Sequence, residues 1–232
     1  IEFCKLYSLA NTEKRYAPLP KYPAMVRDFA MVVAEEVNKL DKKPGLVVIQ
    51  VGEDPASSVY VRNKEKACEY CGIKVITQKL PEDITEKELL TSIDMWNKSE
   101  INGILVQLPL PKHIDEQRVL NAIDNIKDVD GFHPVNVAKL WLNDPTAIIP
   151  CTAKGVIKLI ESTGESLVGK NAVVVGRSNI VGKPMAQMLL RRNATVTICH
   201  SHTKNLDDII SAWTGELVKG IAMAVGVCVF DE

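Results

Sequence analysis

The sequence lacks a strong net charge, a long apolar run and a basic leader. Its formal net charge of −1 gives no electrostatic reason to expect nucleic acid or an anionic membrane as a partner. The longest apolar stretch, residues 220–230, is shorter than the roughly 18 residues that a membrane span needs. No basic region followed by an apolar core opens the chain, so we expect no secretory signal. The 46% hydrophobic and 25% charged content are typical of a soluble globular protein.

Cysteine is also too sparse to form a disulfide framework. Six cysteines are spread through the chain, which favours reduced thiols in the cytoplasm or in a mitochondrial matrix after loss of a targeting segment. Cys68 and Cys71 form a lone pair, and a closed zinc site needs more ligands. Cys199, His200 and His202 follow one another along a strand end, where neighbours alternate between faces. We therefore predict no metal site.

Strand and helix patterns alternate through the first half of the chain. Apolar runs suggest strands, and apolar residues at helical spacing indicate the helices between them. The predicted strands cover residues 46–51, 74–79 and 103–108, and the predicted helices cover residues 24–39, 56–71 and 85–97. This alternation predicts a parallel sheet covered by helices. From residue 131 to 150 we expect an irregular chain, followed by a helix over residues 153–162.

Residues 172–203 have the pattern of a strand, a turn, a helix and a second strand. Gly176 follows the first apolar run, and the spacing Gly176-x-Ser178-x-x-x-Gly182 differs from the common dinucleotide-binding spacing. A helix N-terminus after such a turn offers free N–H groups to a phosphate. We favour a dinucleotide site, with a purely structural turn as the alternative. Two α/β domains with an active site in the cleft between them would account for the whole chain.

The residues after the second of these strands bear on the choice of cofactor. An Asp or Glu usually binds the free ribose hydroxyl of NAD at this point. This chain has His200 and Ser201 instead, with Arg177 in the preceding loop. Guanidinium, imidazole and hydroxyl groups suit a 2′-phosphate better. The turn therefore favours NADP, and NAD is the alternative.

Polar side chains also follow the predicted strands of the first half. Ser57, Tyr60 and Lys64 lie on the helix after the first strand, with Tyr60 and Lys64 four residues apart on one face. Gln107 ends the third strand, and Asp130 comes later. A lysine near an aromatic ring in a partly apolar cleft is prepared for proton transfer, and an amide could orient it. Spacing alone also fits Lys64 as solvated surface and Asp130 as a turn residue.

Five motifs resemble, in order, those of the methylenetetrahydrofolate dehydrogenase/methenyltetrahydrofolate cyclohydrolase family. They are VGEDPASSVYVRNKEKAC at 51–68, VQLPLP at 106–111, DVDGF at 128–132, PCTAKG at 150–155 and VVGRSNIVGKP at 174–184. The resemblance implies oxidation of 5,10-methylenetetrahydrofolate with NADP, then hydrolysis of the methenyl product to 10-formyltetrahydrofolate. Such an enzyme serves one-carbon metabolism and purine biosynthesis.

The resemblance also implies roles for residues in the folate site. Lys64 would transfer protons in the cyclohydrolase step, Gln107 would tune it, and Ser57 would support it. Tyr60 would stack on the folate and belong to the catalytic set, and Pro109 would line the site. Asp130 would bind the pterin, because a carboxylate can accept two parallel hydrogen bonds from it.

The resemblance further implies the cofactor site and the domain organisation. The residues implied in cofactor binding are Thr152, Gly176, Arg177, Ser178, Ile180, Gly182, His200 and Ser201. Residues 1–146 would form a parallel-sheet catalytic domain and residues 147–232 a Rossmann-type NADP-binding domain. The family's cofactor domains usually pair, so a homodimer is expected.

The pattern departs from the family near the end of the chain. An apolar strand expected after Ser211 is skipped between Ala212 and Trp213, and the chain stops before a proline- and glycine-rich loop. We therefore expect the second domain to be incomplete or rearranged. One alternative function is a non-catalytic folate- or nucleotide-binding module. Another is a short-chain dehydrogenase, which has a Tyr-x-x-x-Lys pair, although there the glycine-rich turn precedes the pair.

Overall fold

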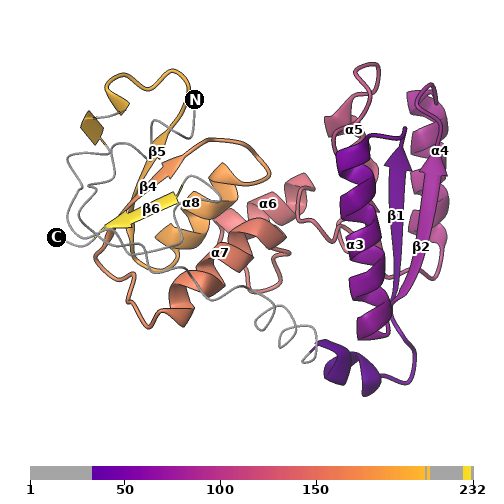
Figure 1. The fold of residues 1–232 in the computed structure, drawn as a ribbon, viewed down its shortest axis with the longest axis horizontal. Coiled ribbons are helices and arrows are strands. Elements are labelled where there is room, and N and C mark those ends of the chain that lie inside the picture. The colour runs from indigo at the N-terminus through magenta and orange to yellow at the C-terminus, as the bar shows by residue number, and fades with distance from the viewer. Residues whose placement is uncertain (1–32, 207, 210–226, 231–232) are drawn as a thin grey trace.

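The computed structural model describes residues 33–206, 208–209 and 227–230, and the side chains of residues 55, 56, 60 and 227–230 lie outside that description. Two lobes are visible, with helix α6 (Pro134–Trp141) between them (Figure 1). The predicted helix over residues 24–39 falls only partly on described residues, of which 33–38 are helical. No helix in the described part of the chain is long and apolar enough to cross a membrane.

The first lobe is a three-stranded parallel sheet with helices on both faces. The strand order is β2-β1-β3, with both neighbours parallel to the central strand. Its elements are β1 (Gly45–Val51), α3 (Pro55–Cys71), β2 (Lys74–Leu80), α4 (Glu86–Lys98), β3 (Gly103–Val106) and α5 (Glu116–Ala122). The predicted β-α-β-α-β pattern is thereby confirmed, with element ends shifted by one or two residues.

Local sequence signals explain where the helices of this lobe begin and end. The Asp54 side chain accepts a hydrogen bond from the Ser57 N–H at 2.7 Å and caps α3. Gly72, with φ of 73°, ends that helix in the left-handed conformation that glycine adopts most easily. Thr85 and Glu88 form a capping box at the start of α4.

Apolar side chains alternate between the two faces of this sheet. Val48 and Leu105 face α3, where Val61 packs against them. Val47 and Ile49 face the other side, against Leu89 and other residues of α4 and α5. Successive strand residues point to opposite faces, so a sheet that is covered on both sides needs almost wholly apolar strands.

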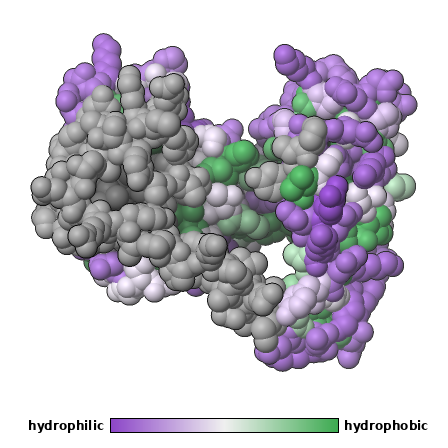
Figure 2. All heavy atoms as spheres, viewed as in Figure 1, coloured by the Kyte–Doolittle hydropathy of each residue, from purple (hydrophilic) through white to green (hydrophobic). Residues whose placement is uncertain are grey.

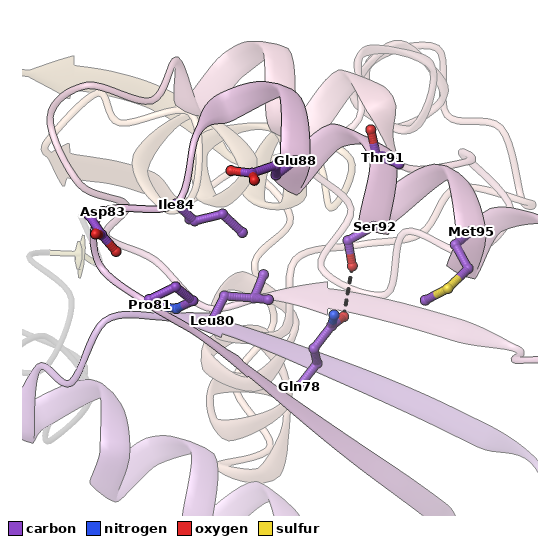
Figure 3. Close-up of a pocket in the computed structure, with 9 residues that line it drawn as sticks. All are labelled: Gln78, Leu80, Pro81, Asp83, Ile84, Glu88, Thr91, Ser92 and Met95. Carbon is purple, nitrogen blue, oxygen red and sulfur yellow. Dashed lines mark hydrogen bonds between the residues drawn. The ribbon is translucent and has the colours of Figure 1, made fainter.

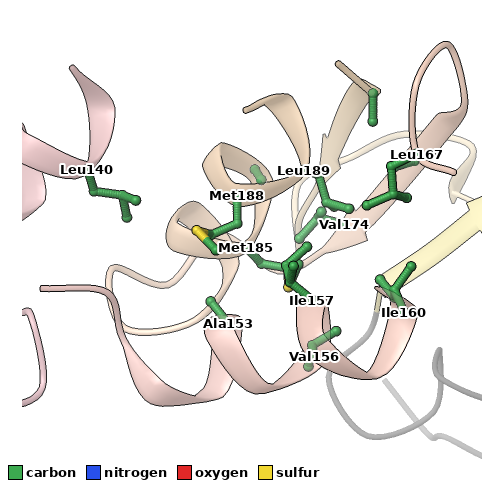
Figure 4. Packing of buried hydrophobic residues seen from close by; sticks show 13 residues of the cluster. Leu140, Ala153, Val156, Ile157, Ile160, Leu167, Val174, Met185, Met188 and Leu189 are labelled. Atoms are coloured by element: carbon green, nitrogen blue, oxygen red, sulfur yellow. The ribbon is translucent and has the colours of Figure 1, made fainter. Parts of the chain in front are cut away.

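The second lobe contains a smaller, mixed sheet. Its elements are α7 (Cys151–Ser162), β4 (Asn171–Val175), α8 (Gly182–Leu190), β5 (Thr195–Cys199) and β6 (Val227–Phe230). The strand order is β5-β4-β6, with β4 and β5 parallel and β4 and β6 antiparallel. Ile157, Met185 and Leu189 are fully buried between α7, α8 and the sheet (Figure 4). The expected gap after Ala212 lies outside the described residues.

The expectation of an irregular chain from 131 to 150 is wrong, because α6 occupies residues 134–141. The His133 ring accepts a hydrogen bond from the Val135 N–H at 3.2 Å, and Pro134 provides the first helical residue. Histidine is not among the strongly preferred N-cap residues, so this start signal is weak in the sequence. With only eight residues, α6 also offers little helical periodicity.

Candidate functional site

Lys64 and Gln107 meet at the carboxyl end of the first sheet. The Lys64 Nζ donates to Gln107 Oε1 at 3.1 Å, in a partly buried contact. Gln107 follows β3, and its backbone N–H donates to the Ile49 carbonyl while its side-chain amide donates to the Leu108 carbonyl at 2.8 Å. Both ends of the amide are therefore engaged, and its oxygen is directed at the lysine. Lys64 is half-buried, not the fully solvated residue of the alternative interpretation.

Asp130 lies within electrostatic reach of Lys64. Burial, more than any other cause, raises the pKa of its carboxyl above the ordinary value of 3.8, and the Asp128 carboxylate adds to this. The Lys64 ammonium acts in the opposite direction. A partly buried carboxylate near a lysine is an arrangement that often marks functional sites.

The first turn of α7 approaches the same group from the second lobe. Desolvation, followed by the Asp130 carboxylate, raises the pKa of the Cys151 thiol, whereas Lys154 and Lys64 lower it. Cys151 and Thr152 are both exposed as residues. Cys151 of the second lobe thus lies close enough to Asp130 and Lys64 of the first lobe for their charges to act on its thiol. In the space-filling view an open notch separates the lobes, with hydrophobic residues at its base (Figure 2).

The remaining residues predicted for the folate site lie on the same elements. Ser57 is buried in the first turn of α3, two helical turns before Lys64. Tyr60 also belongs to α3, and its side chain lies outside the described residues. Pro109 is exposed and follows a cis peptide bond after Leu108. The topology therefore gathers these positions at one edge of the sheet, and their roles remain predictions.

The predicted dinucleotide turn is tight on one side and open on the other. A Cβ atom added to Gly182 would lie 2.3 Å from the Gly176 carbonyl oxygen, so only glycine fits there. Beside Gly176, with φ of 133°, an added Cβ would meet nothing within 4 Å. Such open space beside a partly buried backbone turn fits a phosphate or a nicotinamide dinucleotide.

Ser178 has a structural contact that the sequence did not predict. Its hydroxyl oxygen accepts hydrogen bonds from the Val181 and Gly182 N–H groups, at 3.1 and 3.2 Å, at the start of α8. Two backbone donors are therefore already satisfied within the protein. A hydroxyl can accept two hydrogen bonds and donate one. The Ser178 proton can still be given to a phosphate oxygen.

The residues after β5 form a compact turn near the predicted cofactor turn. The Thr203 hydroxyl accepts from the His200 N–H at 2.8 Å, and the His200 Nδ1 atom accepts from the His202 N–H at 3.2 Å. A neutral His200 would therefore carry its proton on Nε2 and present it as a donor. Ser201, Arg177 and Ile180 are exposed, so they are accessible to a ligand.

A groove of about 730 Å³ lies away from this group, between β2 and α4 (Figure 3). Gln78 crosses its floor and accepts hydrogen bonds from Ser92 and from the Trp96 indole. Gln78 points to the α4 face of the sheet, whereas Lys64 lies on α3 at the opposite face. The groove is therefore separate from the predicted site.

Two residues of this region were not predicted from the sequence. Cys151 belongs to the motif at residues 150–155, and its position beside Thr152 at a helix start is the signal that could have indicated it. Asp128 belongs to the same motif as Asp130, and no feature of the sequence distinguishes it there. It is buried and accepts hydrogen bonds from the loop around it. A buried charge of this kind cannot be distinguished from a turn residue by spacing.

Two α/β lobes, with a glycine-lined turn before a helix in the second, define a two-domain protein of the dinucleotide-binding class. Residues 23–130 match the model of the tetrahydrofolate dehydrogenase/cyclohydrolase catalytic domain, and residues 150–227 match that of the NAD(P)-binding domain. The chain belongs to the tetrahydrofolate dehydrogenase/cyclohydrolase family. The predicted boundary between residues 146 and 147 remains a prediction.

Curated relatives have closely similar sequences. The bifunctional protein FolD of Acetivibrio thermocellus is 48% identical over 215 residues, covering 89% of this chain and 75% of the relative. That of Enterococcus faecalis is 56% identical over 181 residues, covering 76% and 64%. The chain thus spans between about two thirds and three quarters of the length of these relatives.

Solved structures of the family have the same fold. The bifunctional enzyme FolD of Campylobacter jejuni matches with a TM-score of 0.77 and 47% identity, over 78% of this chain and 66% of that one. The FolD of Trypanosoma brucei, complexed with NADP cofactor and inhibitor, matches with a TM-score of 0.80 and 36% identity, over 86% and 69%.

Proposed function

We propose that the chain oxidises 5,10-methylenetetrahydrofolate with NADP and hydrolyses the methenyl product to 10-formyltetrahydrofolate. The observation that carries the proposal is the Lys64–Gln107 hydrogen bond, with Asp130 and the start of α7 within electrostatic reach. Family membership over both lobes supports it. Relatives named bifunctional FolD, and one structure complexed with NADP, support both activities and the cofactor.

In the first step, the two lobes bring substrate and cofactor together. Asp130 would accept hydrogen bonds from the pterin ring and orient its one-carbon bridge, with Pro109 and Tyr60 beside it. NADP supplies the hydride acceptor. The Gly176–Gly182 turn, Arg177, Ile180, His200 and Ser201 would hold the dinucleotide, and Thr152 would lie near the nicotinamide. The open space beside Gly176 and the free Ser178 proton fit this assignment.

In the second step, water adds to the methenyl carbon, which carries a delocalised positive charge. The Lys64 amine would take a proton from that water and return one to the departing ring nitrogen. Gln107 would hold the amine in place, because its carbonyl accepts from Lys64 while its amide group is fixed on the Leu108 carbonyl. Ser57, buried on the same helix, would support the arrangement.

We propose a homodimer in the cytoplasm, as the sequence led us to expect. Size-exclusion chromatography with light scattering decides the oligomeric state, and an elution at the monomer mass of 25.6 kDa would contradict it.

The test is incubation of the purified chain with 5,10-methylenetetrahydrofolate and either NADP or NAD, with folate products separated by chromatography. We expect reduced cofactor and 10-formyltetrahydrofolate to form, and to form faster with NADP than with NAD. Binding of folate and NADP by the folded protein without turnover would instead support the non-catalytic module. Turnover of an unrelated alcohol substrate, without folate turnover, would support the short-chain dehydrogenase.

A further inference from the structure

Asp128 lies two positions before Asp130 and is nearly inaccessible, with 2% of its surface exposed. Its Oδ1 accepts from the Gly131 N–H at 3.0 Å. Its Oδ2 accepts from the His133 N–H at 2.9 Å and from the Asn136 amide at 2.8 Å. A buried carboxylate two residues before Asp130 therefore binds three donors that follow Asp130, and charge-assisted hydrogen bonds of this kind are among the strong ones.

Asp128 lies in the loop between α5 and α6, residues 123–133, and two neighbouring side chains fix this loop. Asn136, 1% exposed on α6, also donates to the Asn125 carbonyl at 2.8 Å and so joins the beginning of the loop to the helix after it. The Lys127 ammonium donates to the carbonyls of Trp96, Asn97 and Ser99, at 3.2, 2.6 and 2.8 Å, at the end of α4. These hydrogen bonds attach the loop to the end of α4 and to α6.

The loop also contacts the segment that leads into the second lobe. Gly131 has φ of 71°, and a Cβ atom added to it would lie 2.5 Å from the Ile148 carbonyl oxygen. Ile148 is three residues before Cys151, the first residue of α7. The hydrogen bond between Asp128 and the Gly131 N–H therefore fixes the loop where it meets the interlobe segment.

We propose that Asp128, together with Asn136, is a positioning residue that holds the Asp130 carboxylate toward Lys64 and the start of α7. This inference rests on the proposed function, because Asp130 is there the group that binds the pterin. Asparagine cannot replace Asp128 without loss. Its single oxygen cannot accept from all three donors, and its amide nitrogen would face one of them.

The activity test is a double-mutant cycle of Asp128→Asn and Asp130→Asn. We expect Asp128→Asn to raise the KM for the folate substrate about tenfold or more, because the change removes a charge-assisted hydrogen bond. The KM for NADP should change little. In the Asp130→Asn background the same change should add little, because residues that act as a unit are not additive. Full additivity, or an unchanged folate KM, would overturn the proposal.

Matched variants separate positioning from general damage. Asp115 also accepts backbone N–H bonds, from Gln117 and Arg118, but it is exposed at the start of α5. Asp115→Asn should leave the folate KM unchanged. If Asp128→Asn does not fold, Asn136→Ala removes only one of the three donors and should give a smaller rise in folate KM. An unchanged folate KM in a folded Asn136→Ala would overturn the proposal.

A readout without turnover distinguishes this inference from the proposed function. The Asp130 carboxylate helps to raise the pKa of the Cys151 thiol. Asp130→Asn should therefore speed alkylation of Cys151 at a fixed pH, measured by mass spectrometry of its peptide. If Asp128 positions Asp130, Asp128→Asn should shift the rate in the same direction. This holds even if the parent proves inactive, and an unshifted rate in the folded variant would overturn the inference.

Discussion

At the residue scale, substitution of Arg177 tests most directly whether the protein prefers NADP to NAD. It is exposed in the loop after β4, where a guanidinium can form two parallel hydrogen bonds with a phosphate. We expect Arg177→Ala to raise the KM for NADP by roughly 10- to 100-fold and to leave the KM for NAD nearly unchanged. Steady-state kinetics with each cofactor checks this, and equal effects on both KM values would show that Arg177 does not bind the 2′-phosphate.

We expect the Asp130 carboxylate to lower the stability of the folded protein at neutral pH, although it belongs to the proposed folate site. Because burial raises its pKa above 3.8 in the folded protein, ionisation opposes folding at neutral pH. We expect Asp130→Asn to raise the melting temperature at pH 7. The gain should shrink as the pH falls through the raised pKa, and disappear below the unfolded value, where both states are protonated. Melting curves from pH 3 to pH 8 on parent and variant measure it. A gain that is independent of pH would contradict this cause.

The residues differ in how far the sequence could predict them. Lys64 and Gln107 were expected to meet, and they do, because both follow strands whose carboxyl ends share one edge of the sheet. Ser178 was expected only to bind cofactor, and its contact with the helix start depends on a backbone path that spacing does not reveal. Asp128 was missed for the same reason.

At the element scale, the turn before α8 depends on the absence of a side chain at Gly182. We expect Gly182→Ala to push the helix away from Gly176, costing about 2 kcal/mol or more of the free energy of unfolding, and to weaken NADP binding. Urea unfolding and cofactor titration measure the two effects.

Gly155 provides the matched control for that change. It lies within α7, and an added Cβ would meet nothing within 4 Å. Alanine should stabilise the helix there by about 0.5–1 kcal/mol and leave NADP binding unchanged. Equal effects of the two substitutions on NADP binding would contradict the importance of the turn.

The long elements were the most predictable from sequence. The predicted helix over residues 85–97 corresponds to α4 at Glu86–Lys98, because its capping box and apolar spacing agree. Helix α6 was missed, because it has only eight residues and begins at a histidine. Its stability comes from tertiary contacts such as the buried Asn136 and Leu140, which no local pattern indicates.

At the scale of the whole molecule, Gly131 lies where the Asp128 loop meets the segment that leads into the second lobe. Gly131→Ala would place a methyl group against the Ile148 carbonyl oxygen, so we expect kcat/KM for the dehydrogenase step to fall about tenfold or more. Gly164 also has a positive φ, of 81°, but has open space around it. Gly164→Ala should cost about 1–2 kcal/mol of stability and keep kcat/KM. Comparable loss of activity in both variants would point to backbone strain alone.

The order of strands in the second sheet shows what sequence could not provide. The parallel β4–β5 pair follows from the strand–helix–strand pattern, because such crossovers join parallel neighbours. The antiparallel pairing of β6 with β4 does not follow from it. An apolar run that could pair on either side of β4, in either direction, contains no local information about its register.

The central claim is that Lys64 transfers protons in a working cyclohydrolase, and its direct test is hydrolysis of 5,10-methenyltetrahydrofolate by Lys64→Met. Lys66, exposed on the same helix, provides the matched control as Lys66→Met. We predict that parent and Lys66→Met hydrolyse the substrate alike, whereas Lys64→Met loses about 10²- to 10⁴-fold in rate. Equal rates in the two folded variants would contradict the account.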